Sequence, residues 1–156
     1  MKILFLDIDG VLNSARYDRE KATEDGNIDA SRLELVKEII EKTGARIVLS
    51  STWREHWEKD PTLCDNDGAE INRIFAEYGL TVFDKTPILP QHSPRAVEIG
   101  AWLEEHPEAT AYAILDDETF GWTEALASHW VKTNPRIGRG LEKAHVARAI
   151  ELLNAN

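Results

Sequence analysis

Short apolar runs alternate along the chain with longer segments in which apolar residues recur every three or four positions. The short runs are typical of buried strands, because a strand covered on both faces shows no polar alternation. Strands are predicted at residues 3–6, 47–49, 81–83, 111–115 and 129–131. The periodic segments between them predict amphipathic helices.

Capping residues mark where several of these helices begin and end. Asp29 is suited to cap a helix that Gly44 would end, and Gly79 would end the next helix. Pro94 lies near the first turn of a third helix, and residues 141–153 form a closing helix. The helical residues expected to face the core are Leu33, Val36, Ile39, Ile40, Ile71, Ile74, Phe75, Tyr78, Val97, Trp102 and Leu103.

The alternation of strands and helices predicts an α/β fold. We expect a Rossmann-like three-layer α/β/α sandwich with a central, mainly parallel, five-stranded sheet. With 156 residues, the chain is expected to form one domain, residues 1–156. The polar stretch 13–27 reads as a loop or flap, and 60–68 is the most loop-like internal stretch.

Composition narrows the range of partners. The chain carries 28 acidic and 18 basic residues and a net charge of −10, which disfavours non-specific nucleic-acid binding. Its one cysteine, Cys64, excludes an intrachain disulfide and lies among acidic residues that weaken a thiol nucleophile.

Asp7 and Asp9 interrupt the first apolar run before it reaches the length of a signal peptide, and no segment predicts a membrane span. We expect a cytoplasmic protein.

Acidic and hydroxyl side chains follow the predicted strands at the edge where parallel sheets bind ligands. Those residues are Asp7 and Asp9 after the first strand, Ser50 and Ser51 after the second, and Asp116 and Asp117 after the fourth. Arg95 opens a helix between them. Four carboxylates in one crevice must either hold protons or bind a hard cation. Mg²⁺ is favoured because it takes few carboxylates and fills its other positions with water and phosphate oxygens.

These residue types assign roles in phosphate-ester chemistry. Asp7 would attack phosphorus and carry an acyl phosphate, and Asp9 would act as general acid and then as general base. Ser50 would donate a hydrogen bond to the phosphoryl oxygens and Arg95 would balance their charge. Asp116 and Asp117 would hold or orient the metal ion.

The sequence resembles the haloacid dehalogenase-like (HAD) superfamily over the whole chain. Three motifs carry the likeness in the right order: Asp7-Ile8-Asp9-Gly10-Val11, Ile47-Val48-Leu49-Ser50 and Ile114-Leu115-Asp116-Asp117. The resemblance implies a Mg²⁺ ion bound by the first Asp carboxylate, the backbone carbonyl of the second Asp and an acid of the last motif, here Asp7, Asp9 and Asp116. Closer likeness lies in Leu49-Ser50-Ser51-Thr52-Trp53-Arg54, in Arg95-x-x-Glu98-Ile99-x-x-Trp102-Leu103 and in Gly140-Leu141. These stretches are similar to small HAD domains associated with RNA-repair proteins.

Three points of this resemblance stay open. The family's basic residue matches Arg95 in Ser93-Pro94-Arg95, with Lys85 as the competing position. Trp53 and Arg54 follow the second strand and are candidate substrate contacts, although tryptophans in such positions commonly seal a loop onto the core. Neither gap between motifs has room for a large cap domain, so the open site would admit bulky substrates such as a nucleic-acid end or a phosphoprotein, and would also serve small phosphate esters such as a nucleotide.

The sequence therefore predicts a magnesium-dependent phosphohydrolase. A dehalogenase is disfavoured, because halide leaves without a proton and would need neither Asp9 nor a metal ion. A phospho-aspartate signalling switch and a non-catalytic metal- or phosphate-binding module are the alternatives. The lifetime of the phospho-aspartate separates a switch from an enzyme.

Overall fold

The computed structural model describes residues 1–14, 28–90, 93–119, 121–136 and 138–155. Its centre is a five-stranded, all-parallel sheet in the order β3-β2-β1-β4-β5. The strands are β1 (Lys2–Leu6), β2 (Arg46–Leu49), β3 (Val82–Lys85), β4 (Ala111–Asp116) and β5 (Trp130–Lys132). The predicted α/β fold is confirmed, and all strand pairs are parallel.

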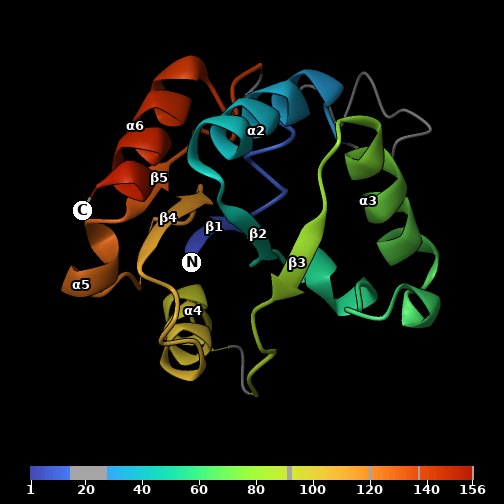
Figure 1. Ribbon diagram of the computed structural model, residues 1–156, viewed down its shortest axis with the longest axis horizontal. Coiled ribbons are helices and arrows are strands. Elements are labelled where there is room, and N and C mark those ends of the chain that lie inside the picture. Colours follow the sequence, from blue (N-terminus) through green and yellow to red (C-terminus); the bar gives the residue numbers. More distant parts are fainter. Residues whose placement is uncertain (15–27, 91–92, 120, 137, 156) are drawn as a thin grey trace.

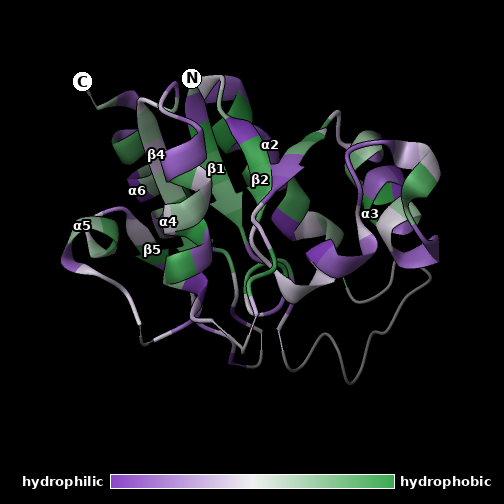
Figure 2. Cartoon of the chain, turned by 90° about the horizontal axis from the view of Figure 1, so that it is seen from below, coloured by the Kyte–Doolittle hydropathy of each residue, from purple (hydrophilic) through white to green (hydrophobic). Residues whose placement is uncertain are grey.

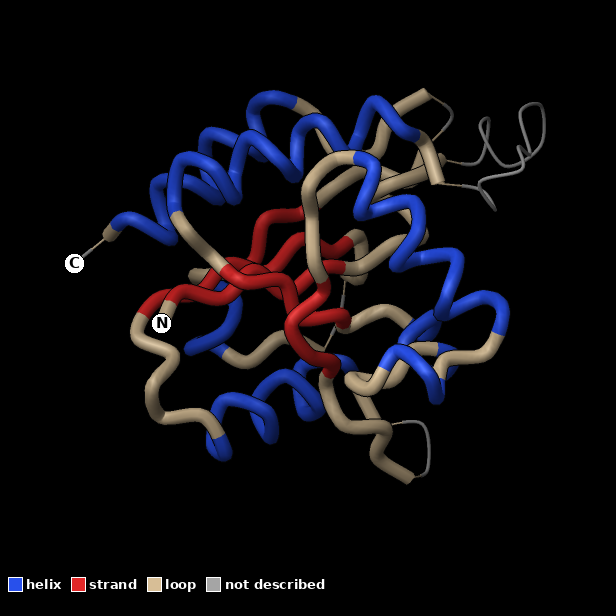
Figure 3. Tube along the Cα trace, turned by 45° about the vertical axis from the view of Figure 1, so that its right-hand side comes forward, coloured by secondary structure: helices blue, strands red, loops and turns tan. Residues whose placement is uncertain are grey.

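Helices cover both faces of this sheet (Figures 1 and 3). They are α2 (Ala30–Thr43), α3 (Asn66–Glu77), α4 (Arg95–Glu105), α5 (Glu124–Ala127) and α6 (Lys143–Asn154). Two 3₁₀ helices that the periodicity did not predict, η1 (Thr52–His56) and η2 (Pro61–Leu63), lie between β2 and α3. No helix in these described ranges is long and apolar enough to cross a membrane.

Alternation along the central strand β1 divides the core in two. Leu4 and Leu6 pack into a cluster with α2, α3 and α6, whereas Ile3 and Phe5 pack into a second cluster with α4 and α5. All four side chains are fully buried, which confirms the prediction, made from the continuous apolar run, of a strand covered on both faces. Figure 2 shows β1 in the hydrophobic colour, with more hydrophilic residues on the surrounding helices.

The predicted helix boundaries hold where capping chemistry is clear. The Asp29 side chain accepts a hydrogen bond from the Ser31 N–H, and Gly44 ends α2 in the left-handed region at φ 71°. Gly79 likewise follows α3 at φ 69°. The stretch 60–68 is less loop-like than predicted, because it contains η2 and the first residues of α3. Of the predicted flap 13–27, residues 15–27 lie outside the described residues.

One predicted core residue is wrong. Val97 is 50% exposed, while Ala96, Ile99 and Trp102 form the buried face of α4. The neighbouring Glu98 is buried instead, because its carboxylate accepts hydrogen bonds from Arg54 at 2.6 Å and from the Leu89 N–H at 3.1 Å. Polar pairing therefore sets the orientation of the first turns of α4.

Candidate active site

The carboxyl edge of the sheet places three predicted site residues side by side. The Asp7 N–H donates to the Leu115 carbonyl and the Ser50 N–H donates to the Leu6 carbonyl, each at 3.1 Å. The ladder of β1 with its two neighbours thus continues one residue past Leu6. Asp7, Ser50 and the last residue of β4, Asp116, consequently lie on adjacent strands at one edge.

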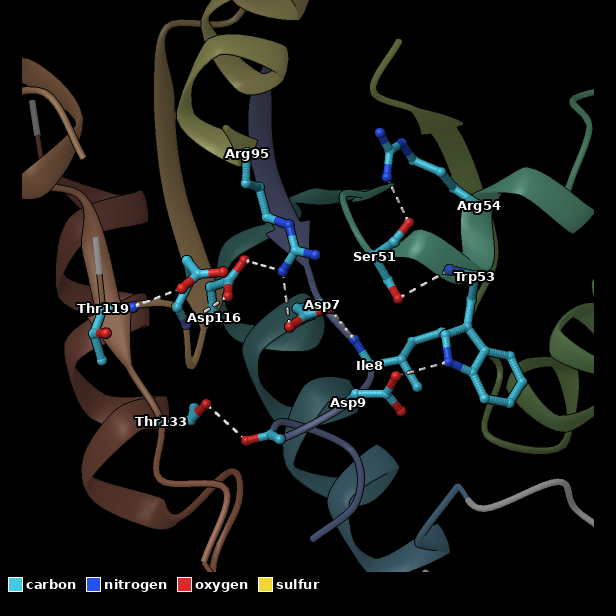
Figure 4. Close-up of polar contacts among 12 residues, drawn as sticks. Asp7, Ile8, Asp9, Ser51, Trp53, Arg54, Arg95, Asp116, Thr119 and Thr133 are labelled. Atoms are coloured by element: carbon cyan, nitrogen blue, oxygen red, sulfur yellow. Dashed lines mark hydrogen bonds and ion pairs between the residues drawn. The ribbon is translucent and has the colours of Figure 1, made fainter. Parts of the chain in front are cut away.

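Three carboxylates gather at this edge with one guanidinium group. Asp7, Asp116 and Asp117 each offer an oxygen within 4.8 Å of the others. The Nη1 atom of Arg95 lies 3.0 Å from Asp7 Oδ2 and 2.8 Å from Asp116 Oδ2, as Figure 4 shows. We call Asp7, Asp116 and Asp117 the buried acidic group, because Asp7 and Asp116 are almost fully enclosed.

The charges of the buried acidic group are not balanced. Burial and the neighbouring Asp116 carboxylate raise the pKa of Asp7 well above its usual range, against the opposing effect of Arg95. Burial and Asp116 also raise the pKa of Asp117. For Arg95, burial alone would lower the pKa, but the carboxylates of Asp7 and Asp116 outweigh it and raise the pKa. One guanidinium group against three carboxylates leaves negative charge that a divalent cation would neutralise, so this donor set fits Mg²⁺.

The hydroxyl of Ser50 is buried at the same edge without a hydrogen-bond partner. Among the described residues, Ser50 Oγ is the only buried side-chain polar atom in this condition. The next residue, Ser51, differs: its hydroxyl caps η1 by accepting from the Trp53 N–H. A buried hydroxyl loses free energy when it lacks a partner. An oxygen of a bound ligand would supply one.

Asp9 lies at the edge of the site with separate partners. Its side chain is exposed and accepts a hydrogen bond from Trp53 Nε1 at 3.1 Å (Figure 4). It accepts a second hydrogen bond from Asn13 Nδ2 at 3.0 Å. Asn13 also accepts from the Gly10 N–H, so it links both ends of the turn. The Asp9 carboxylate is not part of the buried acidic group, because β1 ends at Leu6 and strict strand alternation stops there.

Gly10 allows the turn to approach the acidic residues. Its φ of 80° lies in the left-handed region, and a Cβ at this position would overlap the Asp117 carboxyl group. The Thr133 hydroxyl donates to the Gly10 carbonyl at 2.8 Å and fixes the turn against the end of β5. The sequence pattern gave no indication of the roles of Asn13 and Thr133, because they act through contacts across the fold.

Comparison with protein-family models gives a match over residues 3–146 to the HAD domain in Swiss Army Knife RNA repair proteins. The chain belongs to this HAD family. Comparisons with curated proteins and with solved structures gave no match. The matched residues include parts of all five strands and all the residues of the site described above.

The two candidate cations of the HAD domain lie in different places. Arg95 contacts the buried acidic group directly. Lys85 instead donates from Nζ to the backbone carbonyls of Trp57 at 2.6 Å and Arg54 at 3.2 Å, and it pairs with Glu58. Lys85 thus binds the end of η1, which favours Arg95 as the basic residue of the site.

Arg54 is part of the wall of the HAD domain next to the site. Its side chain is 4% exposed and donates to the carbonyls of Thr86, Ser51 and Pro87 as well as to Glu98. These contacts join η1, the segment after β3 and α4. Trp53, the other predicted substrate contact, lies at the site through its bond to Asp9.

A second cluster of possible metal ligands lies on the surface of the HAD domain. His56, Asp65 and Asp67 offer ligand atoms within 4.8 Å of one another, and we call them the exposed cluster. Protein donors already occupy it: Asp65 Oδ1 caps α3 through the N–H groups of Asp67 and Gly68, and Asp65 Oδ2 lies 2.6 Å from His56 Nδ1. The exposed cluster is therefore explained by helix capping.

Proposed function

We propose that this HAD domain is a magnesium-dependent phosphohydrolase that cleaves a phosphate monoester through an aspartyl-phosphate intermediate. The observation that supports this most directly is the buried acidic group, whose three carboxylates have one guanidinium group, Arg95, between them. Without a cation, such a site can relieve its negative charge only by holding protons. A phosphate ester would bind the cation and Arg95 together.

The metal ion would be held by the carboxylates of Asp7, Asp116 and Asp117, with the Asp9 backbone carbonyl added from the family resemblance. When bound, Mg²⁺ supplies charge neutralisation that lets an anionic nucleophile approach an anionic phosphate. Arg95 would contribute to the same neutralisation, because its guanidinium group already lies at the carboxylates. Ser50 would donate its unpartnered hydroxyl to a phosphoryl oxygen.

Asp7 is the nucleophile in this proposal. Its Oδ1 atom accepts a hydrogen bond from the Ile8 N–H at 2.9 Å, and its Oδ2 atom faces Arg95, so the carboxylate is held in one orientation. A carboxylate oxygen would form a bond to phosphorus as the bond from phosphorus to the ester oxygen breaks. The product of this step is an acyl phosphate on Asp7 and a departing alkoxide.

Asp9 is the general acid and base. It would give its proton to the departing alkoxide, which leaves as an alcohol, and then take a proton from the water that attacks the acyl phosphate. That attack releases inorganic phosphate and restores the Asp7 carboxylate. The two hydrogen bonds from Trp53 and Asn13 would hold Asp9 in place during both steps.

The substrate class rests on two arguments. The chain has no room for a large cap domain, so the site would accept phosphate esters of varied size. The family description names RNA repair proteins, which makes a nucleotide or a nucleic-acid end one class to test, beside small phosphate esters.

The decisive experiment is phosphate release from an aryl phosphate, nucleotides, phosphorylated oligonucleotides and phosphopeptides, in Mg²⁺ or in a chelator. The proposal expects turnover that requires Mg²⁺ and is lost in Asp7→Asn. If the folded protein binds Mg²⁺ but releases no phosphate from any of these substrates, the proposal is wrong. A long-lived phospho-Asp7 would then favour a switch, and its absence a binding module.

A further inference from the structure

A cleft of about 460 Å³ opens directly beside the buried acidic group. Residues of η1, of the segment after β3, of the start of α4 and of the loop after β4 line it. Arg95 lines the cleft and also contacts Asp7 and Asp116 of the buried acidic group. A phosphate held by Arg95 would therefore place the rest of its substrate within reach of this cleft, which has the volume of an ordinary small-molecule pocket.

The charged side chains of the cleft lining that have no ion pair among the described residues are acidic. Its two arginines are already paired, Arg54 with Glu98 at 2.6 Å and Arg95 with Asp7 and Asp116. The other two acids of the lining are Glu55 and Glu118. Neither of them forms an ion pair with any residue in the described part of the chain. A further phosphate group on the substrate would find no free cation in this lining and would face two carboxylates.

The same cleft presents apolar surface. Ile88 is 52% exposed, and Leu89 and Pro94 belong to the same lining. Exposed apolar side chains in a concave site favour contact with uncharged parts of a ligand. The lining thus combines apolar contacts with negative charge.

We propose that this cleft receives the leaving group of the substrate and selects an uncharged, partly apolar alcohol over one that carries further negative charge. The inference rests on the proposed phosphohydrolase function and makes its substrate class specific. The single anionic group of the preferred substrate is the phosphate that is removed. A polynucleotide end is accordingly a poorer substrate than an ester of the same alcohol without charged neighbours.

Two synthetic dinucleotides test the charge dependence without changing the reacting group. Both are 5′-phosphorylated thymidine dinucleotides, one joined by an anionic phosphodiester and the other by a neutral methylphosphonate. At low ionic strength we expect kcat/KM to be about tenfold higher for the neutral dinucleotide. The difference should shrink at about 0.3 M salt, where charges are screened over a few ångströms.

Paired substitutions connect that difference to the cleft. Glu55→Gln with Glu118→Gln should raise kcat/KM for the anionic dinucleotide by about threefold or more at low salt, with a smaller change for the neutral one. Glu104→Gln with Glu105→Gln changes the net charge equally at the exposed end of α4 and should leave both substrates unaffected. Equal or better cleavage of the anionic dinucleotide, together with no effect of the cleft substitutions, would overturn the inference.

Binding provides a readout that does not depend on turnover. Calorimetry with Asp7→Asn in Mg²⁺ should show tighter binding of the neutral dinucleotide than of the anionic one. If none of the aryl phosphate, nucleotides, phosphorylated oligonucleotides and phosphopeptides is hydrolysed in Mg²⁺, the phosphohydrolase proposal fails, while the binding preference still tests the cleft. If hydrolysis is found but the preference is reversed, the cleft inference alone fails, and a polyanion becomes the favoured substrate.

Discussion

Aspartate occurs both in the buried acidic group and in the exposed cluster, but its pKa is shifted in opposite directions in the two places. In the exposed cluster, the hydrogen bond with His56 and the N–H of Gly68 lower the pKa of Asp65. In the buried acidic group, burial and a neighbouring carboxylate raise the pKa of Asp7. The carboxylate of Asp65 is satisfied by protein donors, whereas that of Asp7 lies among other acids with one arginine to compensate them.

This contrast shows how to recognise a reactive site. A group of carboxylates alone does not identify a metal site, because the exposed cluster also brings possible ligand atoms within 4.8 Å of one another. The buried acidic group differs from the exposed cluster because the described residues supply too few hydrogen-bond donors and cations to compensate its three carboxylates. The 3₁₀ helix η1 lies between the site and the exposed cluster: its Trp53 contacts Asp9 at the edge of the site, and its His56 contacts Asp65 of the exposed cluster.

The largest expected difference between the two regions is in catalysis. Asp116→Asn should lower kcat/KM for an aryl phosphate by roughly 10²–10³-fold and weaken Mg²⁺ binding, because it removes a charge that contacts Arg95 and would contact the proposed cation. Asp67→Asn makes the same chemical change in the exposed cluster and should leave both quantities unaltered. Steady-state kinetics and Mg²⁺ titration of the two variants test this. Equal losses in both variants would contradict the contrast.

Trp53 should have a smaller effect that depends on the leaving group. Trp53→Phe removes the N–H that contacts Asp9, so the proposed general acid would be held in place less well. We expect kcat/KM for alkyl phosphates to fall by about tenfold, equivalent to about 1.4 kcal/mol. For activated aryl phosphates, whose leaving groups need no proton, kcat/KM should change much less. Trp57→Phe is the matched control, since that indole donates to Asn72 and does not contact Asp9. A uniform loss across leaving groups would instead indicate a structural role for Trp53.

Asp7→Asn should raise the stability of the metal-free protein although it lowers activity. The pKa of Asp7 is raised in the folded state, so its contribution to stability is complete below about pH 3.9 and is lost as the pH rises through the folded-state pKa. In a chelator at pH 7.5, Asp7→Asn should therefore raise Tm, by about 2–4 °C per kcal/mol of repulsion removed. Thermal melts from pH 4 to 8 should show the gain vanish toward pH 4. A lower Tm at pH 7.5 would contradict the raised pKa.

The smallest expected effect belongs to the cap of α3. Asp65→Ala should lower Tm by about 2–4 °C at neutral pH, because the N–H groups of Asp67 and Gly68 lose their acceptor. The pKa of Asp65 is lowered, so the stabilisation is present above about pH 3.9 and is lost as the pH falls through the folded-state pKa. Phosphate release should not change. A loss of turnover would show that the exposed cluster contributes to the site.

Most of the fold and the edge that carries the site could be predicted from sequence, since both depend on local patterns. Buried runs predicted the strands, and parallel pairing brings the residues after β1, β2 and β4 to one edge. Asp7, Ser50, Asp116 and Arg95 were expected at this edge for that reason, and the structure places them there.

Features that depend on contacts across the fold could not be predicted in the same way. Val97 was expected on the buried face of α4, but the pairing of Glu98 with Arg54 turns the Glu98 carboxylate inward. The bonds of Asp9 to Trp53 and Asn13 depend on the path of the chain after β1 ends. No sequence spacing indicates either arrangement.

The unpartnered hydroxyl of Ser50 has a consequence for laboratory evolution. A buried polar group without a partner lowers stability, so Ser50→Ala should be neutral or favourable in a screen that rewards heat resistance alone. Asp7→Asn would be enriched in the same screen when the medium lacks divalent cations. Libraries of this protein selected only for thermostability would thus drift toward variants that keep the fold but lose the activity proposed for this edge of the sheet. Selection has to include turnover if that activity is to be retained.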